Sequence, residues 1–201
     1  MRLPLSIMAL ALAASSAFAA PPIDENYVKS LASPGKRVLV IEYYDGQGGV
    51  SERKGFASAE PFSVVSPTEL RANADTVVHL YGVEPCEGEM VNRAEDFSGT
   101  CDEFAVQQLE IMLRSASVVF CRAFMSELGA PRQNATCYAW SYFPPSLDAI
   151  DMIEEQRVSL GALRVAKGPD GRPLRTDLDD AASVSRSTGL GMQSDPRTRD
   201  Q

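Results

Sequence analysis

The stretch that decides the fold is residues 76–83, TVVHLYGV, followed directly by EPCE at residues 84–87. Apolar and polar residues alternate along residues 76–83, as in a strand with one buried face. The strand leads through a glycine into two carboxylates, Glu84 and Glu87, and so places acidic groups at one end of a sheet. We therefore take residues 76–138 as the segment that the rest of the chain surrounds.

Other strands are predicted on both sides of this segment from runs of β-branched and aromatic residues. They cover residues 37–44, one or two strands within 50–65, residues 117–124 and residues 133–143. Residues 88–99 are expected to form a polar loop.

Three helices are predicted. Thr100 and Glu103 match a capping box, and the apolar residues that follow recur at helical spacing. A second helix is expected from residue 147 to about residue 160, with Ser146 as its cap, and a third from residue 178 to about 188. Strands followed by helices indicate an α+β fold with a small barrel as its core.

Residues 1–20 have the pattern of a cleaved secretory signal, with Arg2, an apolar run over residues 3–14 and small residues before Ala19. The run is shorter than the ~20 residues that span a membrane. We expect cleavage after Ala19 or Ala20 and a secreted or periplasmic protein with no membrane span. The alternative is a retained anchor helix.

The mature chain divides into three parts on composition. Residues 21–36 are a polar lead, residues 37–192 form one domain, and residues 193–201 are expected to be a mobile tail. Without Arg2, 18 basic residues face 27 acidic ones. Such a charge gives no general attraction for nucleic acid, although a local site for a small anion is compatible with it.

Cysteine usage predicts two disulfides, because an exported chain with four cysteines commonly pairs all of them. Three pairings exist for Cys86, Cys101, Cys121 and Cys137. We favour Cys86–Cys101 and Cys121–Cys137, since each closes a short loop and could contribute ~3 kcal/mol. A zinc site is the alternative, but the chain has no C-x-x-C pair and only one histidine, His79.

The ordered set of motifs resembles the staphylococcal nuclease (thermonuclease) family over about residues 60–195. Residues 78–87, VHLYGVEPCE, are similar to that family's V-R-L-x-G-I-D-x-P-E. Residues 119–121, VFC, and 129–137, GAPRQNATC, are similar to its V-x-C followed by D-R-Y-G-R-x-V-A-x-C. Residues 189–192, GLGM, resemble its G-x-G-aromatic ending, and cysteines near positions 86 and 101 are common in its exported members.

The resemblance implies an OB-fold-like five-stranded β-barrel with three helices, and calcium-dependent hydrolysis of phosphodiester bonds in DNA or RNA. This chemistry needs carboxylates that hold a hard cation and a carboxylate that activates water. It also needs arginines that stabilise the charge on phosphorus.

Site residues follow position by position from the resemblance. Glu87 stands at the catalytic glutamate, Arg132 at the second arginine, and Glu84 replaces a metal-binding aspartate. His79 stands where the first arginine belongs, and a neutral imidazole cannot replace a guanidinium fork. Thr68 stands where a second metal-binding aspartate belongs.

These replacements favour a degenerate member of the family, with weak calcium binding and little or no hydrolysis. We expect a monomeric binding or interaction module for a small phosphate ligand, nucleic acid or another protein. Arg132 is then expected to remain as an ion pair with Glu87. The alternatives are an active calcium-dependent nuclease that uses Glu87 and Arg132, and a stable disulfide-linked structural protein without a ligand.

Overall fold

The computed structural model describes residues 23–201, so the predicted signal peptide lies outside the described residues. The first element is a short helix, α1 (Glu25–Ser30), within the segment expected to be a polar lead. Asp24 caps this helix by accepting a hydrogen bond from the N–H of Tyr27. The Tyr27 ring meets Phe120 edge-on, and Val28 is fully buried beside it. The helix in the described part of the lead is therefore packed against the sheet.

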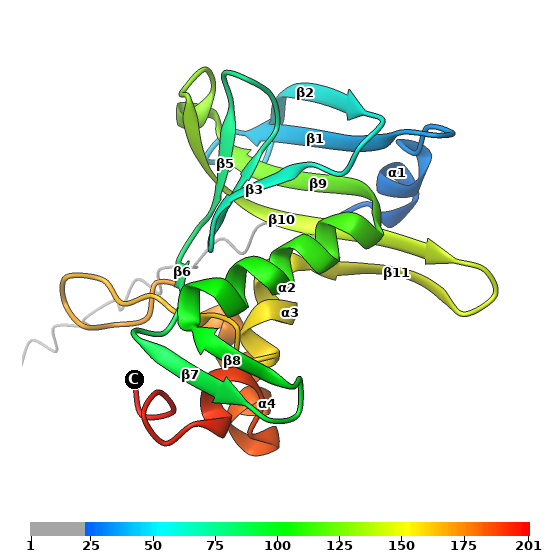
Figure 1. The fold of residues 1–201 in the computed structure, drawn as a ribbon. Helices are drawn as coiled ribbons and strands as arrows, with labels where there is room; N and C mark the ends of the chain where they lie inside the picture. Colours follow the sequence, from blue (N-terminus) through cyan, green and yellow to red (C-terminus); the bar gives the residue numbers. More distant parts are fainter. Residues whose placement is uncertain (1–22) are drawn as a thin grey trace, which may run out of the picture.

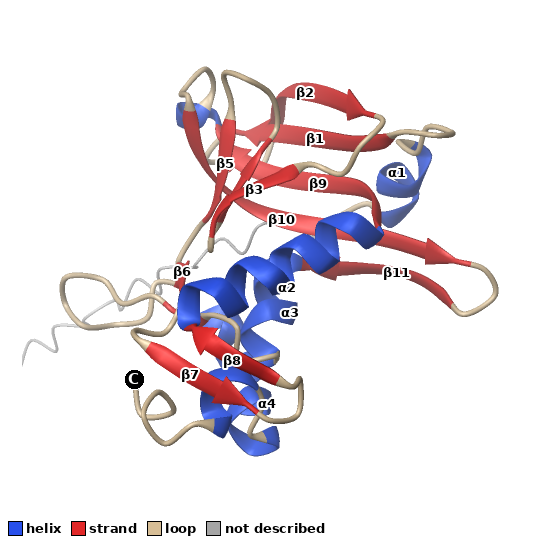
Figure 2. Ribbon diagram, in the orientation of Figure 1, coloured by secondary structure: helices blue, strands red, loops and turns tan. Residues whose placement is uncertain are grey.

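Eight strands form one curled sheet (Figure 1, Figure 2). Their order is β2-β1-β9-β10-β5-β4-β3, and β11 pairs with β10 beside this path. The bounds are β1 (Arg37–Tyr44), β2 (Val50–Ser58), β3 (Ser63–Ser66), β4 (Glu69–Arg71), β5 (Val77–Leu80), β9 (Ala116–Phe124), β10 (Arg132–Phe143) and β11 (Leu147–Met152).

Two of the strand pairs are parallel, β1 with β9 and β5 with β10, and the others are antiparallel. β2 and β3 are the two ends of the strand order, and within residues 23–201 they do not pair with each other, so the sheet does not close through these two strands. The predicted α+β class is confirmed. The described chain has an eight-stranded curled sheet and four α-helices, compared with the five barrel strands and three helices expected.

The helix α2 (Cys101–Ser115) crosses the open side of the curled sheet (Figure 1). The Thr100 hydroxyl accepts from the Glu103 N–H, and the Glu103 carboxylate accepts from the Thr100 N–H, so the predicted capping box is confirmed. Leu109 and Leu113 are buried in the main core, together with apolar side chains of the sheet. Burying such side chains contributes roughly 1.5–3 kcal/mol each, so α2 and the sheet stabilise each other.

The remaining elements gather at one end of α2, below the sheet in Figure 1. They are β6 (Val83–Glu84), β7 (Glu89–Asn92), β8 (Phe97–Thr100), α3 (Ile153–Ser159), β12 (Arg164–Val165) and α4 (Asp179–Thr188), with short 3₁₀ turns at Thr176–Leu178 and Gly191–Ser194. A further 3₁₀ turn, Met125–Glu127, connects β9 to β10 beside the sheet.

Four local predictions were wrong in part. Residues 147–152 form β11 rather than the start of a helix, and Ser146 donates to the Phe143 carbonyl within the turn. The long strand β10 gives this segment a pairing partner that outweighs its local preference for helix, and the helix begins at Ile153. Residues 88–99 form the β7–β8 hairpin around the buried side chain of Met90.

The predicted strand over residues 76–83 is interrupted after Leu80, because Gly82 takes a left-handed backbone conformation with φ +74°. The segment expected to be a mobile tail is also packed. Asp195 and Thr198 are buried, and the Asp195 carboxylate accepts from the Val91 N–H at 3.0 Å.

Both disulfides form in the favoured pairing. Cys121 and Cys137 are directly opposite each other in the antiparallel register of β9 and β10. Cys86 and Cys101 link the loop after β6 to the first residue of α2.

On one side of β10 the pairing partner changes from β5 to β11, and a buried carboxylate lies where neither strand pairs with β10. β5 pairs with β10 up to Ala135, and β11 takes over on the same side from Tyr138. Between them, the Cys137 N–H donates to both carboxylate oxygens of Glu154 at 3.2 Å. Burial raises the pKa of Glu154 to about 7, and the nearby Arg175 guanidinium opposes this rise.

A second buried charge joins the sheet to the helices. Arg157 in α3 is fully buried, and its Nη2 donates to the carbonyls of Pro67 and Ala105 at 2.6 Å. Burial lowers the pKa of Arg157 to about 9, so the guanidinium stays charged at neutral pH. One side chain thus holds the β3–β4 turn, α2 and α3 together.

The raised pKa of Glu154 predicts a pH dependence of stability. Native Glu154 keeps its proton where the unfolded chain has lost it, so the free energy of unfolding should fall as pH rises from 4.5 to about 7. The slope is at most about 1.4 kcal/mol per pH unit. Glu154→Gln keeps a carbonyl for the Cys137 N–H but has no proton to lose, so its stability should lack this component. Urea unfolding of both proteins across that range measures it, and parallel pH profiles would contradict it.

Candidate functional site

The two predicted acidic residues lie at the start of the lower part of the molecule. After Gly82 the chain forms β6, which pairs with β12 so that Glu84 lies opposite Arg164. The loop that follows carries Glu87 and is held to the start of α2 by the disulfide of Cys86. Together these elements line an open depression that also includes Thr100 and Asp102.

Arg164 binds both acidic side chains. Its Nε lies 3.1 Å from Glu84 Oε1, and its Nη2 lies 3.3 Å from Glu87 Oε1. The Glu87 side chain is 84% exposed and that of Glu84 is 44% exposed, so these contacts are screened by water. A guanidinium from the same chain therefore binds Glu84, the residue that the resemblance implies as a metal ligand, and Glu87, the residue that it implies as the catalytic carboxylate.

Arg132, the first residue of β10, has a different partner from the one expected. Its Nε donates to Glu69 Oε1 at 2.5 Å, and this hydrogen bond holds the pKa of Glu69 below its ordinary value. Glu69 lies in β4, directly opposite His79 in β5. The expected ion pair between Arg132 and Glu87 is therefore replaced by a pair across the strands.

His79 is half-buried between β4 and β10. Its Nδ1 lies 2.9 Å from Asn134 Oδ1, a pairing in which the ring nitrogen donates and the amide oxygen accepts. Burial lowers the pKa of His79, and the hydrogen bond to Asn134 opposes this shift. The imidazole is therefore neutral at neutral pH, and it supplies no charge in place of the arginine that the resemblance implies.

The structure thus divides the predicted residues between two clusters. We call Glu84, Glu87 and Arg164 the acidic-loop cluster, and Glu69, His79 and Arg132 the β4–β5 cluster. Among residues 23–201, no ion pair or hydrogen bond connects one cluster to the other. Thr68, at the expected place of a metal-binding aspartate, uses its carbonyl to accept from the Leu80 N–H.

Sequence reasoning missed Arg164. It lies in a two-residue strand in the segment after α3, and its partner strand is 80 residues earlier. No local motif marks it. Only a prediction of the β6–β12 pairing would have placed it beside Glu84.

Comparison with known proteins does not extend this description. The chain matches no model of a known protein family, and no curated protein is significantly similar to it. Within residues 23–201, no group of three or more His, Cys, Asp or Glu side chains is arranged to hold a metal ion. No helix in this part of the chain is long and apolar enough to cross a bilayer. What is established is a disulfide-linked α+β protein with two separate charged clusters.

Removal of Arg164 should make the two carboxylates available to a cation. We expect Arg164→Gln to raise the affinity for Ca²⁺ about threefold to tenfold, because a competing unit charge about 3–4 Å away is lost in a largely solvated setting. Isothermal titration calorimetry measures the change. The matched control is Arg172→Gln, which removes the same charge from an exposed pair with Asp170. Equal Ca²⁺ affinity in the two variants would contradict the prediction.

Proposed function

We propose that this chain is an exported, thermonuclease-like protein whose nuclease site is degenerate and which acts as a binding or interaction module. The proposal for the fold is supported by the strand order β3-β4-β5-β10-β9, with β5 and β10 parallel and α2 placed between β5 and β9 in the chain. This arrangement is the one expected of a partly open Greek-key barrel of the OB type. The hairpin β1–β2 then extends the sheet beyond β9.

The observation that carries the proposed loss of activity is the neutral His79. A nuclease of this kind needs cationic groups against the phosphate, and losing one such contact typically reduces the rate about 10²–10³-fold. The ion pairs Arg164–Glu87 and Arg132–Glu69 each have one largely exposed partner, Glu87 at 84% and Arg132 at 54%, so water screens them and each contributes only about 1 kcal/mol. A ligand could displace those pairs, so the missing charge at His79 has the larger effect.

Export is proposed on two grounds. Two disulfides suit a compartment outside the reducing cytosol. The sequence of residues 1–20 has the pattern of a secretory signal.

An active calcium-dependent nuclease is the second candidate, and the exposure of Glu87 favours it. The side chain is 84% exposed on an open loop, so a cation and a phosphodiester could reach it. In that case Glu87 would activate water, Arg132 would contact the phosphate, and Glu84 would bind calcium.

Cleavage of single-stranded DNA separates these two candidates. We expect the purified mature protein with Ca²⁺ to cleave no faster than its Glu87→Ala variant, because the cationic contact at His79 is missing. Fluorogenic oligonucleotide cleavage measures both rates, and circular dichroism checks that the variant is folded. Calcium-stimulated cleavage that disappears in Glu87→Ala would overturn the proposal and support the active nuclease.

A further inference from the structure

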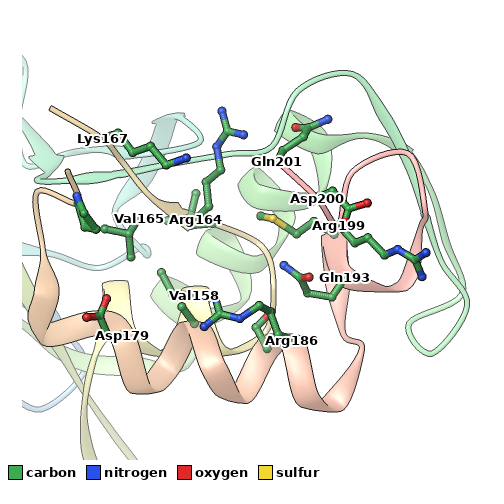
Figure 3. A pocket seen from close by; sticks show the side chains of 15 residues that line it. Val158, Arg164, Val165, Lys167, Asp179, Arg186, Gln193, Arg199, Asp200 and Gln201 are labelled. Atoms are coloured by element: carbon green, nitrogen blue, oxygen red, sulfur yellow. The ribbon is translucent and has the colours of Figure 1, made fainter. Parts of the chain in front are cut away.

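A second cavity lies next to the acidic-loop cluster and shares Arg164 with it, and Gln201, which also lines this cavity, hydrogen-bonds the backbone of Glu87. It has a volume of about 320 Å³, is partly open to solvent, and is lined by α3, β12, the loop after β12, α4 and the C-terminal residues (Figure 3). We call it the α4 cavity. Its volume lies at the lower end of the range for small-molecule sites, about 300–1,000 Å³.

The inner wall of the α4 cavity is apolar. Val158, Leu163 and Met192 line it and are each at most 2% exposed. These side chains belong to α3, the segment before β12 and the last 3₁₀ turn. They are fixed by the surrounding cores, so the cavity is formed before any ligand arrives.

Three basic side chains without acidic partners border this apolar wall. Lys167, Arg186 and Arg199 make no ion pair and no side-chain hydrogen bond with any residue in the described part of the chain. Asp179 and Asp200 also border the cavity, but neither lies within ion-pair distance of a described basic group. All three side chains are exposed, and exposed Arg71 and Arg93 also form no ion pair within residues 23–201, so what distinguishes the three cations is that they border an apolar wall.

Their arrangement suits a ligand with a charged end. In Figure 3, Lys167 and Arg186 lie on opposite sides of Val165 and Val158. Arg199 lies toward the far end, near Gln193. An anionic group between Lys167 and Arg186 would place an attached apolar body against the valines.

We propose that the α4 cavity binds a small organic anion with an apolar body, of the phosphate monoester or carboxylate class. Lys167 and Arg186 bind the anionic group, and Val158, Leu163 and Met192 contact the apolar body. An inorganic anion would leave the apolar wall unused, and a neutral apolar molecule would leave the cations unused. This inference does not depend on whether the nuclease site is degenerate.

The test uses phenyl phosphate and benzoate as probes, with phenol and inorganic phosphate for comparison. Binding to the mature protein is followed by NMR titration of isotope-labelled protein at low ionic strength, because charge contacts are screened by salt. We expect saturable binding of at least one aromatic anion, with shifts in α4 and β12, and weaker binding of phenol and phosphate. The better of the two anions identifies the head group.

Variants locate the site. The double change Lys167→Gln with Arg186→Gln should weaken binding about tenfold or more, since hydrogen bonds to charged groups are worth roughly 1.5–3 kcal/mol each. The matched control is Arg71→Gln with Arg93→Gln, which removes the same charge from two exposed arginines outside the cavity lining. It should leave the affinity within about twofold.

Three results would overturn the inference. One is the absence of saturable binding by either aromatic anion. Another is equal weakening in both double variants, which would indicate a general charge effect. The third is binding of inorganic phosphate as tightly as phenyl phosphate, which would show that the apolar wall plays no part.

Discussion

The change of neighbour along β10 at Cys137 is the constraint on which the rest of the structure depends. A strand that exchanges one partner for another exposes a backbone N–H at the junction, and leaving it buried and unpaired costs about 1–3 kcal/mol. Glu154 supplies the acceptor, and Arg175 supplies a nearby positive charge at 3.9 Å. The burial of a carboxylate is thus the consequence of joining β5 and β11 to one side of the same strand.

Arg175, which lies beside Glu154, also determines where the acidic loop lies. Arg175 donates to the Tyr81 carbonyl, and its side chain covers Gly82 so closely that a Cβ there would lie 2.5 Å from Arg175 Cγ. The chain turns at this glycine, leaves the sheet and pairs with β12. Glu84 and Glu87 therefore meet Arg164, whereas Arg132 remains at the sheet beside Glu69.

The sequence predicted the parts of the fold that local patterns determine. The strand over residues 37–44, the capping box at Thr100 and the pairing of Cys121 with Cys137 all depend on neighbours in the chain or on short loops. β11 could not be predicted in this way, because its residues become a strand only through pairing with β10.

The candidate site was predicted less completely than the fold. The sequence identified Glu84, Glu87 and Arg132 as candidate site residues, but it did not predict which side chains form ion pairs with them. Arg164 is brought to Glu84 by a two-residue pairing across 80 positions, and Glu69 is brought to Arg132 through two strand pairings. Both depend on tertiary structure, which no local motif encodes.

Local charge, rather than net charge, decides where this acidic chain can hold an anion. Fields are screened within about 8 Å at physiological salt, so the excess of acidic residues elsewhere has little effect at a given pocket. In the acidic-loop cluster one guanidinium faces two carboxylates, and in the β4–β5 cluster Arg132 faces Glu69. Neither offers a strong uncompensated positive field to a phosphate. At the α4 cavity, Lys167, Arg186 and Arg199 outnumber the two acidic lining residues, Asp179 and Asp200, and Lys167 and Arg186 form no ion pair with a described residue beside the apolar wall. An anion should therefore bind more strongly there than at the residues that resemble a nuclease site.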